Sequence, residues 1–251
     1  MSGTQAIDRA AELVALVVHA DGPCGFTDLI GRTGLAKSTG SRLLQALERH
    51  QLLERDGTGG FRPGALFALY AARHEPIEEI VRIADPVLRR IGGQTGETVN
   101  LAIPRGDMVV QVAQVDSTYL LGAGNWMGVD VPAYCSALGK VFYAFGRIPL
   151  PTGALERRTP STITNLAKLR RELAGVLDRG YATTRGELEP GLDAVAVPVH
   201  GHDGVVVAAL SVSGPDVRLA KQLDTIGALL VRETKELSGL LGHHPRKDGA
   251  A

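Results

Sequence analysis

The spacing of apolar residues in the first fifty positions predicts three helices. Apolar side chains recur every three or four residues over 7–18, which is typical of one amphipathic helix. A second, short helix is expected over 27–32 with Thr27 as its N-cap, and a third over 36–49. Gly34 supplies the turn between them, because glycine takes a positive φ without strain. Two short helices joined by such a turn form a helix-turn-helix.

A small hairpin is expected directly after the third helix. Residues 52–55 are strand-like, and 56–60 are rich in turn-forming Asp and Gly. Residues 61–62 would form the second strand of the hairpin. A helix-turn-helix followed by a hairpin is a winged helix. We therefore expect a winged helix-turn-helix domain over residues 1–64.

The next segment is short, helical and unusually apolar. Residues 65–73 include Leu66, Phe67, Leu69 and Tyr70, which are too many apolar groups for an independent, solvated linker. Packing against a second copy of the chain accounts for them better. Residues 65–76 are therefore predicted to be a linker helix that ends near Pro76 and mediates dimerisation.

Beyond the linker the pattern alternates between helices and strands. A helix over 77–91, kinked at Pro86, comes first. The strands expected are 98–103, 108–115, 181–184, 195–199 and 205–213, with a hairpin turn at 104–107 and helices at 136–145, 165–179 and 218–241. This is an α+β architecture, an antiparallel sheet flanked by helices, similar to GAF and PAS sensor domains. We assign 77–242 to this second domain and expect the polar tail, 243–251, to be disordered.

Composition narrows the class of protein without deciding it. The chain has 251 residues, 44% of them hydrophobic, and 27 basic side chains against 27 acidic ones. It is too apolar for intrinsic disorder, and no segment is long and apolar enough to span a membrane. The N-terminus has no signal-peptide pattern, and two cysteines, Cys24 and Cys135, fit a reducing compartment. We expect a cytoplasmic protein.

A net charge of zero argues against nucleic acid as a partner, but the local charge does not. Six basic and three acidic side chains lie between Arg32 and Arg62, a local charge of +3. The third helix would enter the major groove, where its N-terminal polar residues reach base edges and phosphates. A solvated surface of mixed charge, or a winged helix used for protein contacts, are the competing interpretations. The candidate DNA contacts are Thr27, Lys37, Ser38, Thr39, Ser41, Arg42, Gln45, Arg55 and Arg62.

The residues around Gly34, in the turn between the second and third helices, closely resemble the DNA-reading segment of the IclR family of bacterial transcription regulators. The matching motifs, in order along the chain, are 33–39 (TGLAKST), 42–44 (RLL), 47–48 (LE), 95–101 (TGETVNL), 136–140 (SALGK), 162–164 (TIT), 179–182 (RGYA), 187–191 (ELEPG) and 209–215 (ALSVSGP). The resemblance extends from about residue 5 to 240. It implies a winged-helix dimer on a roughly palindromic operator, with pairing of dimers into tetramers through the second domain.

The DNA-reading segment departs from the family at two places. Gly40 stands where a β-branched or small apolar residue is usual, and a glycine inside a helix costs about 0.5–1 kcal/mol relative to alanine. We therefore expect a less rigid helix in the free protein. The helix also ends in 49–51 (RHQ), where a glycine C-cap is common.

The resemblance also implies a small-molecule pocket in the second domain, between the sheet and the segment 120–138. The matching wall positions are Leu120, Ala123, Val131, Ala137, Leu138, Thr184, Leu192, Ala194, Ser211 and Ser213. Ser211 and Ser213 are two apart on one strand, so both hydroxyls face the same side and can hold a carboxylate or a hydroxyl. The amides around residues 137–139 begin a helix and favour an anion. A small organic acid or oxygenated metabolite is the expected effector.

The pocket departs from relatives that bind small oxoacids. Thr184 stands where some have Asp, Ala194 where some have Cys, and Asp193 where a basic residue is frequent. Losing an acceptor and a thiol leaves a less polar pocket, and Trp126 is placed to act as its lid. The hypothesis is that the effector is larger or more apolar than a two- or three-carbon oxoacid.

Catalysis and metal binding are the alternatives from other classes. Cys135 precedes a helix, where a thiolate would be stabilised, and His200 or His202 would have to serve as its base. Both histidines fall in a hairpin turn that is expected to be exposed, and they form no zinc spacing with other ligands. No P-loop, dinucleotide-binding or metalloprotease motif occurs, so no cofactor, metal or catalytic residue is predicted. The function expected is that of a transcription regulator, by the family's commoner mode a repressor, controlled by a metabolite.

Overall fold

The computed structural model describes residues 3–73 and 76–243. The chain forms two compact units that divide between Glu78 and Glu79. No helix within these described ranges is long and apolar enough to cross a membrane. Most of the predicted tail, residues 244–251, lies outside the described residues.

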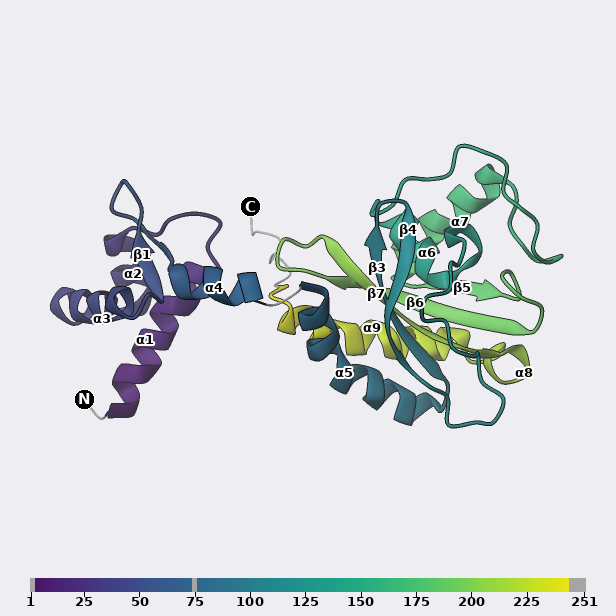
Figure 1. Ribbon diagram of the computed structural model, residues 1–251, viewed down its shortest axis with the longest axis horizontal. Coiled ribbons are helices and arrows are strands. Elements are labelled where there is room, and N and C mark those ends of the chain that lie inside the picture. Colours follow the sequence, from purple (N-terminus) through teal and green to yellow (C-terminus); the bar gives the residue numbers. More distant parts are fainter. Residues whose placement is uncertain (1–2, 74–75, 244–251) are drawn as a thin grey trace. The chain divides into compact units, whose positions relative to one another are not determined.

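The N-terminal unit is a winged helix-turn-helix (Figure 1). Its elements are α1 (Gly3–Val18), α2 (Phe26–Thr33), α3 (Lys37–Arg49), β1 (Leu53–Arg55), β2 (Phe61–Pro63) and α4 (Ala65–Arg73). The core joins one face of each of the first three helices to the hairpin, through fully buried Leu13, Leu29, Leu44 and Phe61. Leu43, next to Leu44 on α3, is only partly buried.

The start of α2 differs from the sequence prediction, whereas its end agrees with it. Thr27 is not the N-cap: the helix begins at Phe26, and Gly25 occupies the cap position. The reason lies in the hairpin, because Cys24 pairs with Phe61 in both directions at 2.8 Å and fixes where the extended chain ends. Gly34 takes φ 63° and ends α2 in the left-handed conformation, as the turn requires.

Gly40 lies where α2 and α3 approach each other. A Cβ atom built at this position would lie 2.0 Å from Cδ1 of Ile30. Ile30, which is itself buried, therefore fills the space that a side chain at position 40 would need. The glycine has a packing reason in this chain, beyond any loss of helix rigidity.

The end of α3 carries backbone strain at a residue that is not glycine. Gln51 has φ 58°, a conformation that costs an L-residue about 1–2 kcal/mol. We expect Gln51→Gly to stabilise the N-terminal unit by about 1 kcal/mol, measured as slower amide hydrogen exchange in its core helices. Gly64→Ala is the opposing control, because its Cβ would lie 2.3 Å from the carbonyl oxygen of Gln51. Unchanged or faster exchange in the Gln51 variant would contradict the assignment of strain.

The C-terminal unit is built on a five-stranded antiparallel sheet in the order β4-β3-β7-β6-β5 (Figure 1). Its strands are β3 (Thr98–Arg105), β4 (Met108–Val115), β5 (Ala182–Arg185), β6 (Leu192–His200) and β7 (Val206–Pro215). Its helices are α5 (Pro76–Thr95), η1 (Ala133–Cys135), α6 (Ala137–Ala144), α7 (Leu166–Arg179), α8 (Asp216–Leu219) and α9 (Leu223–Leu240). The predicted α+β class is confirmed.

The sheet lies between two layers of helices, with α6 and α7 on one face and α5 and α9 on the other (Figure 1). On the α6 face, small sheet residues such as Ala102, Ala196 and Ala209 pack against Val141 and Phe142. Alanines leave room there for the helix and for the cavity described below.

Several element boundaries differ from the prediction. α5 runs to Thr95 and continues through Pro86, and the closing helix is split into α8 and α9. β3 includes Pro104, which is tolerated because β3 pairs with β7 only as far as Ala102. The hairpin turn is therefore shorter than predicted, with Gly106 at φ 63°.

Candidate DNA-reading helix and effector cavity

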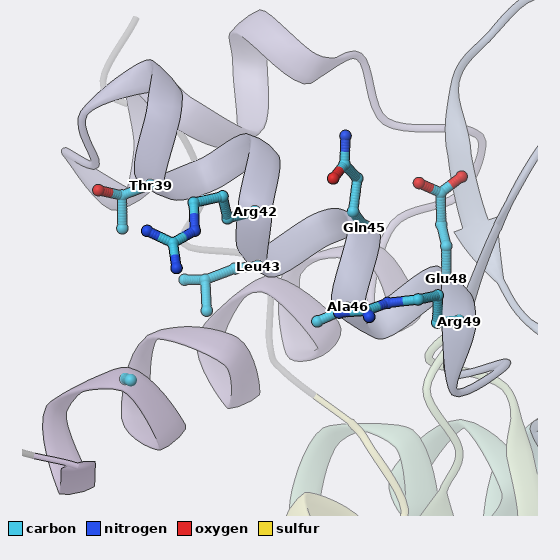
Figure 2. A pocket seen from close by; sticks show the side chains of 8 residues that line it. Thr39, Arg42, Leu43, Gln45, Ala46, Glu48 and Arg49 are labelled. Atoms are coloured by element: carbon cyan, nitrogen blue, oxygen red, sulfur yellow. The ribbon is translucent and has the colours of Figure 1, made fainter.

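The exposed face of α3 carries the polar residues that the sequence singled out. Lys37, Ser38, Arg42 and Gln45 are exposed, while Thr39 and Ser41 are half-buried. Figure 2 shows Thr39, Arg42 and Gln45 projecting from α3, where they line an open groove. Within residues 3–73, Lys37 and Arg42 form no ion pair, so their charges are available to a phosphate backbone.

The two arginines of the hairpin are engaged within the protein. Arg55 bonds Glu48 at 2.9 Å and lies 4.4 Å from the centre of the Phe61 ring, and Arg62 bonds Glu54 at 2.7 Å. Exposed ion pairs of this kind contribute about 0–1 kcal/mol, so a phosphate can displace them at little cost. Thr27, the remaining candidate, is exposed on α2.

A cavity lies between the sheet and the start of α6. Its wall contains eight of the ten predicted effector positions: Val131, Ala137, Leu138, Thr184, Leu192, Ala194, Ser211 and Ser213. Six further residues complete it: Asn100, Gln111, Trp126, Cys135, Ser136 and Leu188. Of these six, Trp126 is the lid candidate and Cys135 the possible nucleophile expected from the sequence.

Leu120 and Ala123 do not line the cavity. Leu120 is fully exposed, because its neighbours are attached elsewhere: Arg218 donates to the carbonyl oxygen of Leu121 at 2.6 Å and lies 4.3 Å from the Tyr119 ring. Arg218 is itself held by the buried carboxylate of Glu97. This attachment turns the segment 119–121 toward α8, and the loop reaches the cavity further along, at Trp126 and Val131.

The cavity lies over a polar row on one face of the sheet. Ser211 pairs with Asn100 of β3 and Ala196 of β6, and Ser213 pairs with Ala194. Directly paired residues of antiparallel strands point to the same face, so these side chains lie together. Asn100 and Ser211 are 2% and 3% exposed, which is an uncommon place for polar side chains in a sheet interior.

Gln111 reaches this face through a β-bulge. Asn100 pairs with Gln114 and Ala102 with Gln111, so Val112 is the extra residue in β4. Gln114 then holds the lid candidate, because its Oε1 accepts the amide of Trp126 at 3.0 Å. Gln111 therefore lines the cavity and Gln114 positions Trp126 beside it, although the two glutamines are three residues apart.

The cavity is small, and its wall contains two amide side chains that the sequence did not single out. Its volume is ≈ 50 Å³, which favours a small effector. Asn100 and Gln111 replace the polar groups that Thr184 and Ala194 lack relative to some family members. The volume does not favour a larger effector, whereas the exposed lining is still mostly apolar, so the more apolar effector stays a prediction.

A buried ion pair lies beside the cavity. Lys140 of α6 is 1% exposed, and its Nζ donates to Glu187 at 2.6 Å and to the carbonyl oxygen of Thr183 at 3.1 Å. Burial raises the pKa of the Glu187 carboxyl, while Lys140 acts in the opposite direction. The pair ties α6 to the turn after β5, whose next residue, Leu188, lines the cavity.

Cys135 has the properties of a structural thiol. It is fully buried, its Sγ lies 3.5 Å from the carbonyl oxygen of Pro132, and burial raises its pKa to about 11. A neutral thiol is a poor nucleophile. His200, predicted to be exposed, is half-buried between Phe145 and His243. No group of three metal-ligating side chains occurs in the part of the chain that the structure describes.

A winged helix-turn-helix unit joined to a unit with a lined cavity defines a ligand-responsive DNA-binding protein. Residues 6–57 match the IclR helix-turn-helix domain, and residues 76–238 match the model described as "Bacterial transcriptional regulator IclR C-terminal". The chain belongs to the IclR family: it is a DNA-binding transcriptional regulator with a C-terminal effector-binding domain, and this family consists of regulators, not enzymes.

Curated relatives match almost the whole chain. The chain is 32% identical to the HTH-type transcriptional regulator BhcR of Paracoccus denitrificans, over 98% of this chain and 90% of the relative. It is 31% identical to the HTH-type transcriptional repressor AllR of Klebsiella pneumoniae, over 98% of this chain and 93% of the relative.

Solved structures share the fold. A putative IclR transcriptional regulator from Silicibacter sp. TM1040 superposes with a TM-score of 0.77 at 26% identity, covering 98% of this chain and 99% of that one. An IclR homologue from Microbacterium hydrocarbonoxydans, solved in complex with 4-hydroxybenzoate, gives a TM-score of 0.60 at 24% identity, covering 94% and 98%.

Proposed function

We propose that this regulator binds a roughly palindromic operator as a homodimer in the cytoplasm and represses transcription until a small metabolite enters the cavity. The observation that carries the proposal is the exposed row of polar side chains on α3, with Lys37 and Arg42 unpaired within the described N-terminal unit. The relatives named as repressors support the direction of control.

The DNA contacts proposed fall into two groups. Lys37, Ser38 and Thr39 begin α3 and lie where a recognition helix meets base edges and phosphates, with Ser41, Arg42 and Gln45 one turn further on. Arg55 and Arg62 on the hairpin, and Thr27 on α2, would contact the flanking backbone.

A gel-shift titration against the DNA upstream of the protein's own coding sequence tests the proposal. We expect a complex that is selective for that DNA over an unrelated duplex and that weakens as salt rises. Binding that is equal for both duplexes would contradict regulation through a specific operator.

Lys37→Ala is expected to weaken operator binding and to lower the salt slope by about one, because each phosphate contact releases about one counterion. The slope of log Kobs against log salt measures this effect. Lys221→Ala removes an exposed charge from the C-terminal unit and serves as the matched control. An unchanged slope for Lys37→Ala would refute a phosphate contact.

An apolar surface on the N-terminal unit supports dimerisation. α4 buries none of its residues within the chain, and Leu66, Leu69 and Tyr70 are 44–48% exposed. A neighbouring groove is lined entirely by apolar residues: Ile7, Ala10, Ala11, Val14, Ala15, Val18, Leu47, Leu52 and Phe67. A second copy of the same surface is the occupant we propose, since two half-sites on DNA require two reading helices. Pairing of dimers into tetramers stays a prediction.

The effector is proposed to bind in the cavity between α6 and the sheet. The amides of Ala137 and Leu138 begin α6 and have no acceptor within the helix, so they suit a carboxylate. A coupling free energy of roughly 1–3 kcal/mol between this cavity and the operator would suffice for control.

A further inference from the structure

Buried polar atoms without partners gather in the effector cavity. Among the described residues, five buried side-chain oxygen or nitrogen atoms have no hydrogen-bond partner, and three belong to cavity residues: Asn100 Oδ1, Gln111 Oε1 and Ser213 Oγ. Asn100 and Ser213 are 2% and 6% exposed. Buried polar groups are almost always satisfied in folded proteins, so three orphans from three neighbouring strands point to a ligand that satisfies them.

The orphaned atoms indicate which chemical group the ligand presents to the sheet. Asn100 Oδ1 and Gln111 Oε1 accept hydrogen bonds, and the Ser213 hydroxyl either donates or accepts. A hydroxyl group of the ligand can donate to an amide oxygen and accept from the serine at once. A keto oxygen only accepts, and it would leave both amide oxygens buried and unpaired.

The other end of the ligand is set by the absence of charged side chains from the wall. None of the described residues lining the cavity is Asp, Glu, Lys, Arg or His. The Ser136 hydroxyl accepts the amide of Gly139 at 3.0 Å and keeps its own hydrogen to donate, so a carboxylate can meet this hydroxyl together with the amides of Ala137 and Leu138. One carboxylate is therefore accommodated at the start of α6, and no charged side chain of the described wall compensates a second.

We infer that the effector is a small monocarboxylic hydroxy acid, whose carboxylate meets the start of α6 and whose hydroxyl donates its one hydrogen to the amide oxygen of Gln111 or Asn100 and accepts from Ser213. This inference rests on the proposed effector site. The cavity volume of ≈ 50 Å³ restricts the acid to a few carbons. The inferred site therefore distinguishes a hydroxy acid from the corresponding keto acid, which differs in the oxidation state of the carbon next to the carboxylate.

Calorimetric titration of the full-length protein with lactate, as each enantiomer, and with pyruvate tests the inference. The two acids match in size and charge and differ only in hydroxyl against keto oxygen. We expect one lactate enantiomer to bind roughly 10–100-fold more tightly than pyruvate, because pyruvate leaves the amide oxygens unpaired. Pyruvate binding as tightly as lactate, or no binding of either acid, would overturn the hydroxy acid assignment.

Gln111→Met identifies the source of the selectivity. Methionine keeps the length of the side chain and removes the acceptor, so the ratio of lactate to pyruvate affinity should fall by about tenfold. Gln94→Met, an exposed substitution on α5 outside the cavity, should leave the ratio unchanged. An unchanged ratio in Gln111→Met would overturn the role of this residue.

The gel shift separates this inference from the proposed function. Operator DNA that stays bound in the presence of lactate overturns the hydroxy acid alone, because operator recognition is intact. A protein that fails to bind its upstream DNA selectively overturns the proposed function itself.

Discussion

Lys140→Met should destabilise the C-terminal unit by about 3–5 kcal/mol, the usual cost of removing one partner of a buried ion pair. Lys140 and Glu187 are 1% and 7% exposed, and the Lys140 ammonium is 2.6 Å from the Glu187 carboxylate. One oxygen of that carboxylate, Oε2, already has no partner. Without Lys140 the carboxylate would remain as an uncompensated buried charge. Urea denaturation followed by the fluorescence of Trp126, the single tryptophan, measures the loss.

The loss of stability caused by Lys140→Met, relative to wild type, should become smaller as the pH falls. Burial already raises the pKa of the Glu187 carboxyl, and removal of Lys140 takes away the interaction that opposes this rise. A carboxyl whose pKa is higher in the folded than in the unfolded state binds more protons when folded, so stability falls as pH rises. We therefore expect a smaller difference from wild type at pH 5 than at pH 8.

Two further variants separate charge from packing. Lys140→Met combined with Glu187→Leu should recover most of the lost stability, because no buried charge remains. Lys235→Met, at an exposed position on α9, should have little effect. A double variant as unstable as Lys140→Met would contradict the electrostatic explanation.

Local chemistry was enough to predict most elements of the winged helix and part of the cavity wall. Gly34 marks the turn because only its φ fits there, and the two-residue spacing of Ser211 and Ser213 places both on one sheet face. The missed N-cap of α2 depended on the pairing of Cys24 with Phe61, a contact between segments far apart in sequence. Local preference for Thr27 was overridden by that pairing.

The residues that complete the cavity could not be read from spacing alone. Gln111 and Gln114 are three apart, so strict alternation places them on opposite faces, and the bulge at Val112 brings them to one. The partner of Lys140 is 47 residues away, in a turn whose position depends on the whole sheet. Asn100 carried a signal that alternation could have exposed, because it is a polar residue between the apolar residues Val99 and Leu101.

The proposed dimerisation would matter more for this regulator than for a strongly basic DNA-binding protein. Its net charge is zero, and several cations around α3 and the hairpin are already paired with Glu48, Glu54 and Asp28. Nonspecific attraction to DNA depends on free cations, so a single winged helix is expected to bind weakly. Two linked winged helices bind the second half-site as an intramolecular event, which raises affinity about 10²–10⁴-fold without any new contact.

Leu69→Glu is therefore expected to lower operator affinity by at least about 100-fold, although residue 69 touches no DNA in the proposed arrangement. Leu69 is 47% exposed on α4, so a charge is tolerated in the monomer but would be buried without a partner between two copies. Gel shift measures the affinity, and sedimentation velocity measures the association of the N-terminal units. Ala71→Glu is the matched control, because residue 71 is exposed on the opposite side of the same helix and carries the same new charge. If Leu69→Glu binds the operator as tightly as Ala71→Glu, the α4 surface is not the interface, and the affinity must come from contacts within one winged helix.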